Sequence, residues 1–274
     1  MDLTCAAWVA NCFPLVSTVV LTPDQLPKRL QALGWVRPVY LRGAPLRDAA
    51  SVAIVGARAA TRDALDRARA LGRHLATRGV QIVSGGALGV DGAAHRGALA
   101  GHGSTTVVLG SGLDVLYPPR HAPLFREIVG RGGTLAGMQP DGTQPRPGMF
   151  PQRNQLIAAL ADVVIVVEAE LRSGSMSTVA AARAFGRLVA AWPGSPGCER
   201  LLAAGAAIIE AGADAELALA GTPRRRAPRT VDPIARQVQE AIARGAVGID
   251  EIVRQTGLTV RAVVRALPLI ERMQ

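Results

Sequence analysis

The chain has 274 residues and a formal net charge of +10, with 49% hydrophobic but only 3% aromatic residues. This length allows one large domain or a medium domain with a small companion, and the Ala-, Val-, Leu- and Gly-rich composition favours an α/β protein over a β-sandwich. Cys5, Cys12 and Cys198 match no zinc spacing and no apolar run has the length of a membrane span, so we expect a cytoplasmic protein without a metal site or a membrane segment.

Almost all of the positive charge comes from arginine, because Lys28 is the only lysine. Arginine binds phosphate through a planar fork of N–H donors, so the excess of positive charge permits a polyanionic partner. A GC-rich genome would also replace lysine by arginine, and the composition does not choose between these two explanations.

Residues 1–50 are predicted to be a short N-terminal extension with a helix near its start, a turn at 22–30 and a strand at 38–43. From residue 51 to 220, short apolar runs alternate with amphipathic segments, and Thr61 and Gly79 bound the first predicted helix. Such an alternation predicts a Rossmann-like doubly wound parallel sheet whose ligands bind at the carboxyl ends of the strands. The strands are expected at 52–56, 80–84, 105–110, 133–137, 163–168, 188–192 and 206–210.

A Pro- and Arg-rich linker is predicted at residues 221–232, followed by a small helical domain at 233–274. The stretch IDEIVRQTGLTVRAVVRAL (249–267) is typical of a helix-turn-helix, with Gly257 in the turn and Thr259 capping the second helix.

Four polar, Gly-rich stretches follow predicted strands, at 55–61, 84–91, 109–119 and 168–178, and should converge on one crevice. In the first stretch Gly56 would let the backbone approach a ligand and Arg58 would clamp a phosphate. The second would leave N–H groups free for an anion at the start of a helix, although it matches neither G-x-G-x-x-G nor a Walker lysine motif. Its candidate residues are Ser84, Gly85, Gly86 and Gly89.

The long loop predicted at 138–154 contains Arg146, Phe150 and Arg153. An aromatic ring flanked by arginines suits stacking of an unpaired base with clamping of its phosphates, and burial of Phe150 beneath the loop is the alternative. Ser173 and Ser175 would cap a helix or donate to phosphate.

Asp91 and His95 are spaced i, i+4, which allows a metal pair but favours a carboxylate that orients a loop or caps the helix. No catalytic triad, metal site or pair of carboxylates is recognisable, so we expect a binding protein without a cofactor and not an enzyme.

The motifs VAIVGAR (52–58), VSGGALGVDGAAHRGAL (83–99), VLGSGLDVLYPPRH (108–121), RPGMFPQRNQLIAALAD (146–162) and VVEAELRSGSMSTVAAARAFGR (166–187) resemble the DNA-processing protein A family, DprA or Smf. The resemblance implies a Rossmann-like core that binds single-stranded DNA, usually as a homodimer, and helps load the RecA recombinase in natural transformation. It also implies a winged helix in the C-terminal domain, and we expect this domain to be a truncated winged helix because a wing hairpin would have to follow Gln274. By motif, Arg58 would grip phosphate, the turn from Ser84 to Gly89 would present N–H groups, and the strand would meet Phe150, Arg153, Asn154, Ser173, Gly174 and Ser175.

The chain departs from the family pattern at three places. Leu88 stands where a basic residue is common, AGMQP (136–140) replaces an S-E-x-P pattern, and Gln155 replaces the second arginine of R-N-R. The two lost basic positions predict weaker phosphate contacts or a changed partner.

Two other functions stay open. Related folds bind small nucleotides or act as nucleotide phosphoribohydrolases, although the P-G-G-x-G-T turn of the hydrolases is absent. Alternatively, the C-terminal helix-turn-helix could read duplex DNA in the major groove, with Arg261 and Arg265 on one side of its second helix. The apolar residues Val260, Val263, Val264 and Leu267 would lie mostly on the other side.

Overall fold

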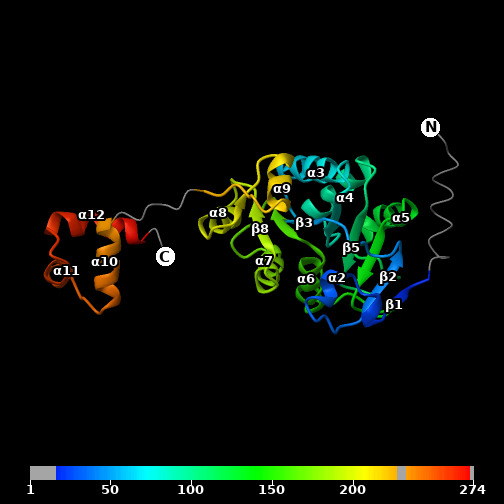
Figure 1. The fold of residues 1–274 in the computed structure, drawn as a ribbon, viewed down its shortest axis with the longest axis horizontal. Helices are drawn as coiled ribbons and strands as arrows, with labels where there is room; N and C mark the ends of the chain where they lie inside the picture. Colours follow the sequence, from blue (N-terminus) through cyan, green and yellow to red (C-terminus); the bar gives the residue numbers. More distant parts are fainter. Residues whose placement is uncertain (1–16, 227–232, 272–274) are drawn as a thin grey trace. The chain divides into compact units, whose positions relative to one another are not determined.

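The computed structural model describes residues 17–226 and 233–271. The chain divides into two compact units, one within residues 1–226 and the other within 227–274, and each contains a hydrophobic core of its own (Figure 1). The helix predicted near the N-terminus and residues 227–232 of the predicted linker lie outside the described residues.

The first unit is built on a nine-stranded sheet in the order β1-β2-β6-β5-β4-β3-β7-β8-β9. Strands β3 to β9 pair in parallel, and β1 and β2 add an antiparallel edge. This arrangement confirms the predicted α/β class with a doubly wound sheet. The strands are β1 (Val19–Leu21), β2 (Val39–Gly43), β3 (Ser51–Val55), β4 (Gln81–Ser84), β5 (Thr105–Leu109), β6 (Thr134–Gly137), β7 (Val163–Val166), β8 (Leu188–Ala191) and β9 (Ala207–Ile208).

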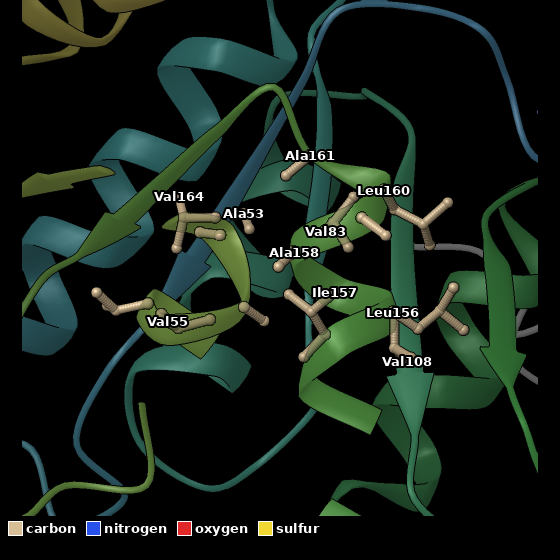
Figure 2. Close-up of a cluster of buried hydrophobic side chains, with 14 of the residues drawn as sticks. Ala53, Val55, Val83, Val108, Leu156, Ile157, Ala158, Leu160, Ala161 and Val164 are labelled. Carbon is tan, nitrogen blue, oxygen red and sulfur yellow. The ribbon is translucent and has the colours of Figure 1, made fainter. Parts of the chain in front are cut away.

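Helices cover both faces of the sheet, so its central strands β3, β4, β5 and β7 are buried at every position and most of their residues are apolar. In β3, Ala53 and Val55 point to one core cluster, whereas Val52 and Ile54 point to the other. Figure 2 shows the first cluster, where Leu156 and neighbouring apolar residues of α6 pack on strand side chains. The helices of this unit are α2 (Lys28–Gln31), α3 (Arg62–Ala76), α4 (Val90–Ala100), α5 (Ala122–Gly130), α6 (Met149–Leu160), α7 (Ser175–Ala184), α8 (Pro196–Ala203) and α9 (Gly212–Leu219), with short 3-10 turns at Pro23–Gln25 and Pro119–His121.

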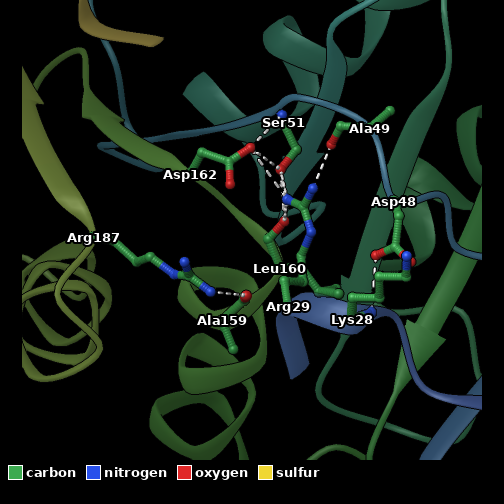
Figure 3. Close-up of polar contacts among 9 residues, drawn as sticks. All are labelled: Lys28, Arg29, Asp48, Ala49, Ser51, Ala159, Leu160, Asp162 and Arg187. Carbon is green, nitrogen blue, oxygen red and sulfur yellow. Dashed lines mark hydrogen bonds and ion pairs between the residues drawn. The ribbon is translucent and has the colours of Figure 1, made fainter. Parts of the chain in front are cut away.

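Part of the predicted N-terminal extension joins this sheet, because β2 pairs with β6. Arg29 of α2 anchors the N-terminal extension to the rest of the unit, as Figure 3 shows. Its Nη1 donates to the carbonyl oxygen of Leu160 at 2.8 Å, lies 3.3 Å from Asp162 Oδ2 and bonds the Ser51 hydroxyl, while Nη2 bonds the carbonyl of Ala49. These contacts join α2 to the start of β3 and the end of α6.

The order of the strands reverses between β3 and β7. From β3 the chain winds to β4 and β5 on one side, and from β7 it winds to β8 and β9 on the other. The carboxyl ends of β3 and β7 therefore flank a crevice, which is where open α/β sheets bind their ligands.

The second unit contains α10 (Pro233–Ala243), α11 (Ile249–Thr256) and α12 (Val260–Glu271). As predicted, Gly257 ends α11 in a left-handed conformation with φ +69°, and Thr259 caps α12 by accepting from the amide of Ala262 at 3.3 Å. The small core of the unit is formed by Ala235, Val238, Ala241, Ala246, Ile252, Val263 and Ala266.

The predicted sides of α12 were wrong for two valines. Val260 and Val264 are exposed together with Arg261 and Arg265, whereas Val263 is buried. The reason is helical geometry. Counted from Val260, positions i, i+1, i+4 and i+5 share the exposed face of the helix, whereas Val263 at position i+3 points to the core. The exposed face of α12 thus combines apolar and cationic side chains.

Candidate functional site

A cavity of about 530 Å³ lies at the carboxyl ends of β3 and β7. Its walls come from four segments distant in sequence, at 55–58, 87–91, 147–157 and 174–178. Three of the four predicted strand-end stretches therefore meet here, joined by the start of α6. The fourth stretch, 109–119, lines a smaller neighbouring cavity through Gly110, Tyr117 and Pro118.

The structure brings about half of the predicted site residues to the wall of this cavity, namely Gly56, Arg58, Phe150, Arg153, Asn154, Gly174 and Ser175. The others lie elsewhere. Gly85 lines the smaller cavity. Neither cavity wall includes Ser84, Gly86, Gly89, Arg146 or Ser173.

The glycine turn before α4 binds a carboxylate of its own chain. Asp91 Oδ2 accepts from the amides of Gly85 at 3.1 Å and Ala87 at 3.3 Å, while the Ser84 hydroxyl donates to the carbonyl of Ile54 at 2.6 Å. The expectation that this turn offers free N–H groups is thus wrong for Gly85 and Ala87. The preference for Asp91 as a loop-orienting carboxylate is confirmed, and the described residues contain no group of three metal-ligating side chains.

Two glycines of the turn serve its shape. Gly86 has φ +68°, and a Cβ atom there would lie 2.7 Å from the ring of Phe125. Gly89 has φ +81° at the start of α4. Other residues would be strained at both positions, and the Gly86 carbonyl is fixed by Nδ1 of His121 at 2.9 Å. The shape of the turn therefore requires glycine at positions 86 and 89.

Arg153 supports the same turn from α6. Its side chain is buried, and Nη1 donates to the carbonyl oxygens of Gly85 and Val108. Burial lowers the pKa of Arg153 to about 10, so the guanidinium stays charged at neutral pH. Burial also raises the pKa of Asp91, and the charge of Arg153 together with the two turn amides opposes that rise.

Two histidines stand behind the turn rather than in the cavity wall. Thr105 donates its hydroxyl proton to the carbonyl of Ile82, so Nδ1 of His95 donates to Thr105 Oγ1 at 2.7 Å. Burial lowers the pKa of His95 to about 3 and also lowers the pKa of His121. His95 is therefore neutral at physiological pH and belongs to the scaffold of the site.

The open wall of the cavity carries a cation above an aromatic ring. Arg58 is exposed, and its Cζ lies 5.6 Å from the centre of the half-buried Phe150 ring. Phe150 belongs to the first turn of α6 and not to a loop as predicted, because Gly148 at the N-cap and Pro151 in the first turn are compatible with a helix start. The ring is only partly buried, so the alternative of a Phe150 buried beneath the loop is wrong, and Cζ of Arg153 also lies 5.9 Å from its centre.

The N-terminus of α7 forms the opposite wall. Asn154 Nδ2 donates to Ser177 Oγ at 2.6 Å and so joins α6 to α7. Ser175 begins the helix and exchanges a 2.8 Å hydrogen bond with Ser173. The first turn of α7 has no acidic residue, so the partial positive charge of this helix end favours an anion in the cavity.

Several lining residues were missed from the sequence. Ser177 and Thr178 follow the serines that were identified, and the helical period would have placed Thr178 one turn after Ser175. Leu88 and Tyr117 line the smaller cavity. Both lie in strand-end stretches that were singled out. Leu88 was noted only as a departure from the family pattern, and neither side chain has a charge that marks it as a phosphate-binding residue.

Comparison with known proteins supports a family assignment. A family described as DNA recombination-mediator protein A matches residues 17–220, and one described as DprA winged helix domain matches residues 222–271. A DprA-type DNA processing protein of Mycobacterium tuberculosis is 43% identical over 237 residues, which cover 81% of this chain and 60% of that protein. The protein Smf of Escherichia coli is 44% identical over 151 residues, which cover 54% of this chain and 40% of Smf.

Solved structures agree with this result. DNA processing protein A of Streptococcus pneumoniae matches with a TM-score of 0.68 at 33% identity, over 79% of this chain and 77% of that one. The Helicobacter pylori protein of the same name also has a TM-score of 0.68, at 32% identity over 76% of this chain and 98% of that one. Because the first family alone matches more than half of the chain, this protein belongs to the DNA recombination-mediator protein A family, known as DprA or Smf.

Proposed function

We propose that this protein binds single-stranded DNA in the cavity at the β3–β7 switch point and acts in DNA processing and recombination. The observation that carries the proposal is the exposed Arg58 guanidinium above the accessible ring of Phe150. A cation beside a stacking surface suits a nucleotide whose base is unpaired, since every base offers a π-face to the ring. The structure of the Helicobacter pylori relative is described as showing single-stranded DNA binding, which supports the same class of ligand.

In this proposal the two walls have separate roles. Arg58 and the N-terminus of α7 hold phosphate oxygens, while Phe150 stacks a base. Arg153 and Asn154 position these groups from α6, Arg153 through the turn carbonyls and Asn154 through Ser177. Binding of this kind depends on charge and stacking, so it is tolerant of sequence.

We further propose that the cavity binds its ligand without catalysis. Its lining includes serines but no histidine, and Asp91 is already held by two amides. A serine nucleophile needs a base within hydrogen-bond reach, and the neutral His95 stands behind the turn.

The finer assignments rest on family membership. We propose that the protein acts as a homodimer in the cytoplasm and delivers single strands to the RecA recombinase. None of the described helices combines the length and apolar character that a bilayer crossing requires.

The test is a salt series of binding to an oligo(dT) strand and to the matching duplex, followed by fluorescence anisotropy. We expect tighter binding of the single strand, and log K should fall against log salt with a slope of about −0.7 for each phosphate neutralised. Equal affinity for the duplex, or binding that ignores salt, would overturn the proposal. Thermal stabilisation by mononucleotides, NAD or ADP-ribose without oligonucleotide binding would instead support the nucleotide-sensor alternative.

A second candidate function concerns the C-terminal unit, and the exposed face of α12 favours it. Val260, Arg261, Val264 and Arg265 all point to solvent from one side of this helix. Arginine can contact guanine or phosphate and valine can contact a thymine methyl, so this face suits the major groove of duplex DNA. Deleting residues 222–274 should then abolish duplex binding and leave oligo(dT) binding in place, whereas unchanged duplex binding would refute this role.

A further inference from the structure

Next to the main cavity lies a second, smaller one of about 100 Å³, with the ring of Phe150 in the wall of both. Leu88, Tyr117 and Pro118 belong to the smaller cavity only. A single water requires about 10–15 Å³ of cavity volume, so the smaller cavity has room for a group of several heavy atoms. That is the size of a planar ring rather than of a single ion or water.

The walls of this cavity suit a planar apolar face. Tyr117 is 42% exposed, and its ring centre lies 5.8 Å from that of Phe150 with 42° between the planes. Leu88, 36% exposed, adds an aliphatic surface. At Gly110 a Cβ atom would lie 3.1 Å from Cδ1 of Phe150, so the absence of a side chain lets the backbone of this wall approach the ring without a clash.

A buried polar group borders the inner end. Arg153 lines the smaller cavity and is only 6% exposed, and its buried Nε has no hydrogen-bond partner among the described residues. A buried N–H donor without a partner costs free energy, and a ligand acceptor would remove that cost. The carbonyl oxygens and ring nitrogens at the edge of a nucleobase are acceptors of this kind.

The geometry points to a second nucleobase site in this cavity. We infer that an unpaired base enters between Leu88 and Tyr117, next to the nucleotide that stacks on Phe150, with its polar edge toward Arg153. The inference rests on the proposed function and deepens it. It also gives a role to Leu88, which stands where a basic residue is common in the family, because an apolar side chain contacts a base better than a phosphate.

The test separates base contacts from phosphate contacts. Tyr117→Ala and Tyr117→Phe are measured against oligo(dT) and against an abasic strand that has the same number of phosphates. Since stacking contributes about 1–3 kcal/mol per base, Tyr117→Ala should weaken oligo(dT) binding roughly 5- to 150-fold and change binding of the abasic strand less than about twofold. Tyr117→Phe keeps the ring and should bind oligo(dT) like the wild type. Arg58→Ala is the matched control and should weaken both strands.

Equal weakening of both strands by Tyr117→Ala, or no weakening of either, would overturn the inference. If a Tyr117 variant does not fold, a measurement on the wild-type protein still tests the inference. With 2-aminopurine placed in turn along a short oligo(dT), two adjacent positions should be quenched, and quenching at one position would count against a second base site. If the wild type does not bind oligo(dT) at all, the proposed function itself fails. This outcome differs from the Tyr117 and 2-aminopurine results, which test only the second base site.

Discussion

The two sides of the glycine turn at residues 84–91 use charged residues in opposite ways. On the cavity side, Arg58 is exposed above an aromatic ring. On the inner side, which is the buried part of the cavity wall, Asp91 and Arg153 are hydrogen-bonded to backbone groups of the turn. Charge close to a glycine turn therefore does not by itself indicate a ligand, because the turn can need that charge for its own shape.

This difference has an energetic cause. A buried charge is tolerated only when its hydrogen bonds are made, and removing one partner leaves the other without compensation. An exposed charge already has water as a partner. We therefore expect substitutions on the inner side to change folding and substitutions on the cavity side to change binding.

The largest effect is expected for Asp91→Ala. The substitution leaves the amides of Gly85 and Ala87 unpaired and removes the negative charge near the buried Arg153, so the free energy of unfolding should fall by about 3–5 kcal/mol. Urea denaturation measures this change. Asp66→Ala removes an exposed i, i+4 partner of Arg62 and serves as the control, with an expected loss of about 0.5 kcal/mol or less. If both variants lost a similar free energy of unfolding, Asp91 would not have the stabilising role described for the inner side.

A smaller change in the free energy of unfolding is expected when His95 is protonated at acidic pH. The unfolded state binds a proton at this residue below about pH 6.5, whereas the folded state does so only near pH 3, so stability is lost as the pH falls through this window. Between about pH 6.5 and 4.5 the loss from this residue should be about 2–3 kcal/mol. Asp91, whose pKa burial raises, acts in the opposite direction. The quantity to compare is thus the pH slope of the wild type and of His95→Gln.

The variant His95→Gln should have the shallower slope of the free energy of unfolding over this range. His102 is exposed, so His102→Gln is the matched control and should keep the wild-type slope. If His95→Gln and the wild type have parallel pH profiles, His95 is not the buried neutral group described above.

On the cavity side, Arg58→Ala should weaken oligo(dT) binding by about 1.5 kcal/mol, which is roughly tenfold. The slope of log K against log salt should become shallower by about 0.7, because one phosphate contact is lost. The free energy of unfolding should change by no more than about 0.5 kcal/mol, since the side chain is exposed. If Arg58→Ala lowered the free energy of unfolding as much as Asp91→Ala does, Arg58 would be a residue that stabilises the fold and not a ligand-binding residue.

The smallest effect is expected for Leu88→Lys, which places a cation at the exposed rim of the smaller cavity. We expect the salt slope to steepen by about 0.7, while affinity for oligo(dT) at low salt changes less than about threefold, because the new phosphate contact offsets the loss of the apolar contact with the base. Leu88→Gln is the uncharged control. An unchanged salt slope would show that the strand does not pass this rim.

The fold was predictable because its signals are local and repeated. Parallel strands such as Ser51–Val55 are buried at every position and consist mainly of apolar residues, and the helix Arg62–Ala76 has a recognisable cap at Thr61. The convergence of the strand ends followed from the expected topology. The pairing of Val39–Gly43 with Thr134–Gly137 was not predictable, since nothing within residues 17–50 specifies a distant antiparallel partner.

The site was predictable only to the level of segments. Whether an amide of the turn is free depends on the position of Asp91, and whether Arg153 faces a ligand or a carbonyl depends on how α6 packs. Both are consequences of tertiary structure. Tyr117 was overlooked although its stretch, 109–119, was singled out, because its contact with Phe150 joins residues far apart in the chain.

The most direct test of the account is photocrosslinking of the wild-type protein to an oligo(dT) strand that contains 5-iodouracil, with the modified residues identified by mass spectrometry. A strand that stacks in the two cavities should crosslink to Phe150 and Tyr117. Crosslinks confined to residues 233–271, or to the sheet edges far from β3 and β7, would contradict it.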